Sequence, residues 1–206
     1  MSGLVENLPA KRKSRVRRKP SVNRGVKVLI AIALIVVVSV VVYQMIGKND
    51  TATNSGPTRV LLVTSMGNIT IELYGDMPIT SGNFKDLTED GVYDGTLIHR
   101  VVHDFVIQGG DASIKGIIVP TILDELPNKH SNVRGSVAMA KTSAPNSATS
   151  QFYINLKDNV SLDSNYSVFG RVIEGMGVVD AIGNVETDAN DKPLQDVTLT
   201  QAEITE

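Results

Sequence analysis

The stretch RVLLVTSMGNITIELY, residues 59–74, alternates apolar and polar side chains over two short runs. An alternation with a period of two places one face of an extended chain in a core and the other in solvent, so residues 59–65 and 69–74 are predicted to be half-buried strands. Met66, Gly67 and Asn68 between the two runs predict a tight turn. The stretch therefore indicates an antiparallel β-hairpin.

The same kind of pattern recurs along the rest of the chain. Short helices are predicted over residues 78–89 and 176–182. Eight short strands joined by brief connections indicate an all-β fold, a closed or nearly closed antiparallel barrel with two short helices. Closing the sheet would also remove its exposed edges. The six further strands are predicted at residues 97–102, 105–108, 136–140, 151–155, 168–173 and 197–204.

The residues before the predicted barrel have a different composition. Residues 28–47 form 20 successive positions without a charge, enough for a helix to cross a hydrocarbon core of about 30 Å. Nine Lys and Arg residues lie within residues 11–27, and only Lys48 follows closely. By the positive-inside rule, the N-terminus is predicted to be cytoplasmic and the part after residue 47 extracytoplasmic. A cleaved signal peptide is the alternative, but the basic lead is long and no small-x-small cleavage site stands clearly after Tyr43.

These patterns divide the chain into four predicted segments, and they indicate a single-pass protein of the cell membrane. Residues 1–27 are a basic cytoplasmic tail, residues 28–47 a transmembrane signal anchor in contact with membrane lipid, residues 48–57 a flexible linker and residues 58–206 a globular domain. No helix-pairing motif of small residues marks the span, so a monomer is expected.

Composition excludes several classes of function. The chain has no Cys, so disulfide scaffolds, thiolate zinc sites and cysteine nucleophiles are excluded. Residues 49–206 carry 10 Lys and Arg against 21 Asp and Glu, so this part should repel nucleic acid. His99 and His103 would lie about 13 Å apart along one strand face, too far to share a metal, and no metal site is expected. The acidic pairs Asp124–Glu125 and Asp188–Asp191 are interpreted as solvated loop faces.

Residues 98–111, IHRVVHDFVIQGGD, carry the first sign of chemistry. Arg100 and Gln108 interrupt an otherwise apolar run, and a buried charge is costly unless it is paired or functional. Arg100 is therefore either a satisfied ion-pair partner or a working group. Gly109 and Gly110 would permit a backbone conformation that residues with a Cβ resist.

Three blocks in this order, HRVVHDFVIQGGD, GSVAMAKTSAPNSATSQFYINLKDN and LDSNYSVFGRVIEGMGVVDAI, resemble the cyclophilin family, and in particular its bacterial, extracytoplasmic type. The resemblance covers nearly all of residues 58–206. It implies a closed eight-stranded antiparallel barrel with a helix at each end, and peptidyl-prolyl cis–trans isomerase activity on proline-containing polypeptides without a cofactor.

The same resemblance implies roles for individual residues. Arg100 would be the catalytic arginine, and Gln108 would hydrogen-bond the substrate backbone. The residues expected to contact the substrate are Phe105, Val106, Ala140, Lys141, Tyr153, Leu162 and Tyr166. Substrate preference is expected to differ from that of other members, because Val106 replaces a usual Met and residues 111–122 lack a Gly-rich loop. Ser161, where many members have Trp, argues against tight cyclosporin binding.

The sequence therefore predicts a membrane-tethered isomerase that accelerates X-Pro isomerisation while extracytoplasmic proteins fold. The alternative is a non-catalytic peptide-binding or chaperone module on the same fold. Ser161 favours this alternative, whereas the presence of both Arg100 and Gln108 argues against it.

Overall fold

The computed structural model describes residues 56–205, which belong to one compact unit. The predicted basic tail, the predicted span and most of the predicted linker lie outside these residues. Over residues 56–205, neither the length nor the hydropathy of any helix is sufficient for a membrane span.

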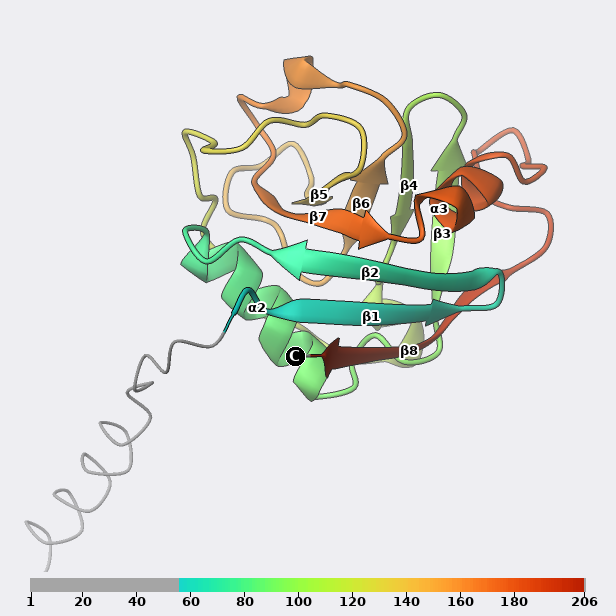
Figure 1. Cartoon of the computed structure of the whole chain (residues 1–206), viewed down its shortest axis with the longest axis horizontal. Helices are drawn as coiled ribbons and strands as arrows, with labels where there is room; N and C mark the ends of the chain where they lie inside the picture. Colours follow the sequence, from blue (N-terminus) through green and yellow to red (C-terminus); the bar gives the residue numbers. More distant parts are fainter. Residues whose placement is uncertain (1–55, 206) are drawn as a thin grey trace, which may run out of the picture. The chain divides into compact units, whose positions relative to one another are not determined.

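Eight antiparallel strands close into a barrel in the order β1-β2-β7-β5-β6-β4-β3-β8 (Figure 1). All eight predicted strands and both predicted helices are confirmed, with boundaries within two residues of those expected. The 3₁₀ turns η1 (Ala112–Lys115) and η2 (Val160–Leu162) were not predicted. The strands are β1 (Arg59–Thr64), β2 (Gly67–Leu73), β3 (Thr96–Val102), β4 (Val106–Gly109), β5 (Ser136–Met139), β6 (Phe152–Asn155), β7 (Val168–Glu174) and β8 (Val197–Thr205).

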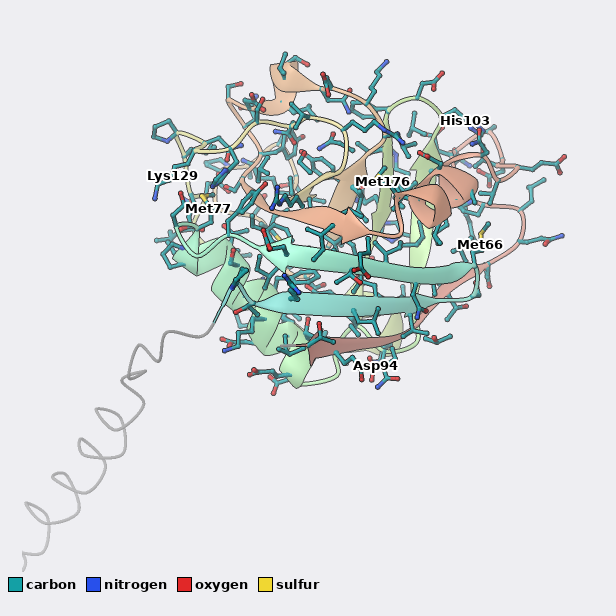
Figure 2. All side chains as sticks on the ribbon, in the orientation of Figure 1. Met66, Met77, Asp94, His103, Lys129 and Met176 are labelled. Carbon is teal, nitrogen blue, oxygen red and sulfur yellow. The ribbon has the colours of Figure 1, made fainter. Side chains whose placement is uncertain are left out.

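The first hairpin forms as predicted, but its turn lies one residue earlier. Thr64 pairs with Gly67, so the turn consists of Ser65 and Met66, and Met66 is partly exposed at its tip (Figure 2). The Thr64 hydroxyl donates to the Gly67 carbonyl at 2.6 Å and accepts from the Met66 N–H at 3.1 Å. These two bonds hold the shorter turn, and the positive φ of Gly67, 131°, lets β2 begin there.

Two helices pack against the barrel, one near each end of the β1–β2 hairpin (Figure 1): α2 (Pro78–Glu89) and α3 (Met176–Gly183). Phe84 of α2 is fully buried, and its ring centroid lies 4.9 Å from that of Phe169 and 5.2 Å from that of Phe152. Val179 and Ile182 of α3 are likewise fully buried. Both helices therefore contribute side chains to the barrel core.

The loop that follows η1 contradicts the interpretation of Asp124 and Glu125 as solvated. The Asp124 carboxylate is 2.9 Å from Lys141 Nζ, and the two side chains are only 12% and 10% exposed. Glu125 Oε2 accepts hydrogen bonds of 2.6 Å from both the backbone N–H and the hydroxyl of Thr80 in the first turn of α2. The interpretation was wrong because both carboxylates bind partners distant in sequence, which no local pattern reveals.

The strands β5 and β6 are buried on both faces. Phe152 and Ile154 of β6 point into the barrel core, whereas Tyr153 belongs to a second, smaller apolar cluster. Since neighbouring residues of a strand point to opposite faces, this cluster lies on the outer surface of the barrel. Residues from the loops cover it incompletely and leave a pocket there.

Candidate active site

The pocket is built on a row of residues paired across neighbouring strands. Arg100 of β3 pairs with Gln108 of β4, Gln108 pairs with Tyr153 of β6, and Tyr153 pairs with Ala138 of β5. A register shift between Ile98 and Arg100 precedes the row. Such a shift changes which side chains share a face with the neighbouring strand, so the row depends on this irregularity.

The pocket has a volume of about 180 Å³. Its lining unites every residue for which the sequence predicted a catalytic or substrate-binding position: Arg100, Phe105, Val106, Gln108, Ala140, Lys141, Tyr153, Leu162 and Tyr166. The structure brings these nine residues together around one pocket. The role of each residue remains a prediction. The structure thus provides one small cavity whose lining combines apolar side chains with two cations and an amide.

Two glycines allow the backbone to pass close beneath this region. A Cβ on Gly109 would lie 2.6 Å from Ile98 Cδ1, and one on Gly110 would lie 2.8 Å from the ring of Phe152. Gly110 also has a positive φ of 76°. Larger residues would displace β3 or the core aromatic ring, which explains the glycine pair after β4.

Arg100 is both paired and directed at the pocket, so the two interpretations of this residue are compatible. Its Nη2 lies 3.3 Å from Asp191 Oδ2, and the two side chains are 39% and 44% exposed. The sequence predicted that Asp191 belongs to a solvated loop face, but the structure shows that its carboxylate pairs with Arg100. Asp188 is exposed, but its carboxylate accepts hydrogen bonds from the backbone N–H groups of Asn190 and Lys192, which lower its pKa.

Gln108 is oriented by a second glutamine. Its Nε2 donates to Gln151 Oε1 at 2.8 Å, which leaves the Gln108 carbonyl oxygen available on the other side of the amide. His99 lies near Gln151, and burial lowers the pKa of His99 despite the opposing influence of Asp111, the Leu97 backbone and the Gln151 side chain. His99 is therefore expected to be neutral at neutral pH.

Tyr153 is held by buried polar residues that the sequence analysis did not single out. Its hydroxyl donates to Asn132 Oδ1 at 2.7 Å, and burial raises the pKa of Tyr153. The backbone and side-chain N–H groups of the fully buried Asn132 donate to Asp163 Oδ1 at 2.7 and 2.8 Å. No local signal identifies Asn132, because its partners are 21 and 31 residues away.

Asp163 fixes the wall of the pocket. It lies between the lining residues Leu162 and Tyr166, and Ser131 Oγ donates to its second oxygen at 2.5 Å. Burial raises the pKa of Asp163, but the hydrogen bonds from Ser131 and Asn132 together lower it by more, so the pKa lies below its ordinary value. Asn132 therefore connects Tyr153 with Asp163, the residue that follows η2.

Within residues 56–205, no three His, Cys, Asp or Glu side chains are grouped in a way that could hold a metal ion. His103 is exposed at the β3–β4 turn (Figure 2), whereas His99 is partly buried within β3. The pocket lining offers a guanidinium, an ammonium, an amide and two phenols, but no base paired with a nucleophile. This set suits recognition and electrostatic stabilisation better than covalent catalysis.

Comparison with known proteins adds independent information. The model of the family described as cyclophilin type peptidyl-prolyl cis-trans isomerase matches residues 59–204. A peptidyl-prolyl cis-trans isomerase of Acinetobacter baylyi is 47% identical over 140 residues, which cover 63% of this chain and 74% of that protein. A peptidyl-prolyl cis-trans isomerase of Streptomyces antibioticus is 44% identical over 162 residues, which cover 70% of this chain and 97% of that protein.

A solved structure shares the fold. The crystal structure of a Cryptosporidium parvum cyclophilin type peptidyl-prolyl cis-trans isomerase, determined in the presence of the dipeptide Ala-Pro, superimposes with a TM-score of 0.67 at 28% identity. The match covers 72% of this chain and 99% of that chain. The first 58 residues lie outside the family match.

Proposed function

The chain belongs to the cyclophilin-type peptidyl-prolyl cis-trans isomerase family, and from this membership we propose that it isomerises X-Pro bonds at the pocket around Arg100 while tethered to a membrane. The isomerase activity and the binding of proline-containing peptides follow from the family itself. The residue roles, the membrane tether and the extracytoplasmic clients are our proposal.

The chemistry requires no covalent step. Rotation about a prolyl bond has a barrier of about 18–20 kcal/mol because the C–N bond has partial double-bond character. In the twisted state this character is lost, and the prolyl nitrogen becomes able to accept a hydrogen bond. An enzyme accelerates rotation when it binds the twisted bond more tightly than either planar form.

Arg100 has the properties that this task requires. Its guanidinium remains charged at every working pH and presents donors in a planar fork. It borders the pocket and is bonded to Asp191 through only one of its terminal nitrogens. The remaining N–H groups of Arg100 would donate to the prolyl nitrogen of the twisted substrate.

The other lining residues would hold the substrate on both sides of the rotating bond. The Phe105, Val106, Tyr153 and Leu162 side chains form apolar walls on which a proline ring would pack. Gln108, with its amide fixed by Gln151, would hydrogen-bond the adjoining backbone. One observation carries the proposal: the strand register aligns Arg100, Gln108 and Tyr153 along a single apolar pocket.

The membrane tether and the extracytoplasmic location are supported by the sequence alone. The charge-free run at residues 28–47 has the length of a span, and the basic residues precede it. We propose that the isomerase acts on X-Pro bonds of polypeptides that fold on the outer side of that membrane. The uncatalysed reaction takes tens to hundreds of seconds, so such clients would benefit from catalysis.

The residue assignment is tested on the full chain in mild detergent, with a proline-containing tetrapeptide and NMR exchange or protease-coupled detection. Arg100→Ala should lower kcat/KM by about 100- to 1000-fold, the range for losing a preorganised donor. Arg171→Ala is the matched control, because Arg171 is an exposed arginine that pairs with Glu72 and does not line the pocket. Normal turnover by a folded Arg100→Ala variant would overturn the assignment.

A further inference from the structure

A second residue is placed to act on the reaction through Arg100. The loop between α3 and β8 folds into a tight turn at its tip, where Thr187 and Pro193 form an isolated bridge. Asp188 stabilises this turn: its N–H donates to the Lys192 carbonyl at 2.8 Å, and its carbonyl accepts from the Asp191 N–H at 3.1 Å. The turn is thus a defined structure that presents Asp191.

Asp191 contacts two adjacent residues of β3. Its carbonyl accepts a hydrogen bond of 2.8 Å from the Val101 N–H, and its carboxylate lies 3.3 Å from Arg100 Nη2. Strand β8 pairs with β3 only from Thr96 to Ile98. Asp191 therefore binds β3 beyond the point at which pairing with β8 ends.

The backbone of Asp191 has an unusual conformation. Its φ is +62°, in the left-handed region that residues other than Gly, Asn and Asp rarely adopt. Conformations of this kind persist where the surroundings enforce them, and they concentrate at functional sites. The backbone bond to Val101 and the turn at Asp188 provide such surroundings.

We propose that Asp191 is a positioning residue that holds the Arg100 guanidinium at the edge of the pocket. This inference rests on the proposed catalytic role of Arg100. An arginine side chain that is 39% exposed samples several rotamers unless a partner limits them. One bond to Nη2 restrains the plane of the guanidinium and leaves its other donors free for the substrate.

The series Asp191→Asn and Asp191→Gly separates the side chain from the backbone. Both residues tolerate a positive φ, so the turn is retained. Asn keeps an acceptor oxygen without the charge, whereas Gly has no side chain. Asp196→Asn is the control for charge, because Asp196 is exposed in the same loop and, among the described residues, its side chain makes no ion pair or hydrogen bond.

The enzyme used is the full chain in mild detergent, with a proline tetrapeptide at saturating and subsaturating concentrations. Exposed ion pairs are weak, so Asp191→Gly should lower kcat/KM by about three- to fivefold. The loss should fall on kcat more than on KM, because Arg100 is proposed to act on the twisted state. Asp191→Asn should recover part of the activity, and Asp196→Asn should behave as wild type.

The same substitutions in an Arg100→Ala background complete the test. If Asp191 acts through Arg100, Asp191→Gly should cause no further loss there. In 15N spectra, the Arg100 Nε–Hε signal, assigned by its absence from Arg100→Ala, should shift or broaden in Asp191→Gly. An equal loss in both backgrounds, or an unchanged signal with wild-type kcat, would overturn the inference. If Arg100→Ala itself retained full activity, the proposed role of Arg100 would fail first, and the role of Asp191 with it.

Discussion

At the level of single residues, the pocket is lined by a row of three paired side chains from the strands β3, β4 and β6. Gln108 is the central member, paired with Arg100 on one side and Tyr153 on the other. Each member also has a partner of its own: Asp191 for Arg100, Gln151 for Gln108 and Asn132 for Tyr153. The side chains that would meet the substrate are therefore held before it arrives, which reduces the cost of ordering them on binding.

Substitution of Gln108 tests the amide in this row. Gln108→Leu removes the hydrogen bond that we expect to the substrate backbone and keeps a side chain of similar size. A hydrogen bond contributes about 0.5–1.5 kcal/mol, so kcat/KM should fall by up to about tenfold, mainly through KM. Steady-state kinetics with the tetrapeptide would measure it, with the exposed Gln201→Leu in β8 as control. An unchanged KM would contradict this role.

His99 gives a prediction about pH and stability. Burial lowers the pKa of His99 in the folded chain below its ordinary value of 6.5. As the pH falls below 6.5, the unfolded chain therefore binds a proton at this position before the folded chain does, and folding stability must decrease. Urea unfolding at several pH values between 7.5 and 5 should show this decrease, and His99→Gln should reduce it. An equal slope in the wild type and in His99→Gln would contradict the prediction.

At the level of elements, every strand and both helices were predictable, because their patterns are local. Alternation in β1 and β2 follows from one buried face. The site residues were predicted from the family resemblance. The alternation alone indicated only that Arg100 is a charged residue in an apolar run. The roles of Asp124, Glu125 and Asp191 could not be predicted, since each depends on how a loop returns to a distant element.

Glu125 is an example of a loop residue that binds the end of a helix. The N-cap residue of α2, Met77, makes no side-chain capping bond. The Glu125 carboxylate supplies one from outside the helix, through the N–H and hydroxyl of Thr80. A negative charge at this end also interacts favourably with the helix dipole.

Removing this carboxylate should destabilise the domain. Glu125→Ala is expected to lower the free energy of unfolding by about 1–2 kcal/mol, as for the loss of a good cap. Glu89→Ala at the opposite end of α2 is the control, because its 3.7 Å pair with Lys85 is exposed and such pairs contribute only about 0.2–0.5 kcal/mol. Urea denaturation measures both variants, and equal effects would show that Glu125 does not cap the helix.

At the level of the whole molecule, the barrel order separates the entry of the chain from the pocket. Residues 56–58 lead directly into β1, and β1 pairs with β2 and β8. In the closed order β1-β2-β7-β5-β6-β4-β3-β8, strand β6 is four strands from β1 in either direction. Tyr153 of β6 lines the pocket, so the pocket is built on the strands opposite to the one with which the barrel begins.

The orientation of the chain in the membrane can be tested with single cysteines, because the chain contains none. Ser14→Cys places a thiol in the predicted cytoplasmic tail, and Ser143→Cys places one at an exposed position after β5. A membrane-impermeant maleimide added to intact cells should label Ser143→Cys and leave Ser14→Cys unlabelled until the cells are lysed, because the positive-inside rule predicts a cytoplasmic tail. Labelling of Ser14→Cys alone in intact cells would reverse the orientation. If the mature protein lacked residue 14, with no label on Ser14→Cys even after lysis, the apolar run would be a cleaved signal peptide rather than an anchor, and the isomerase would act without a tether.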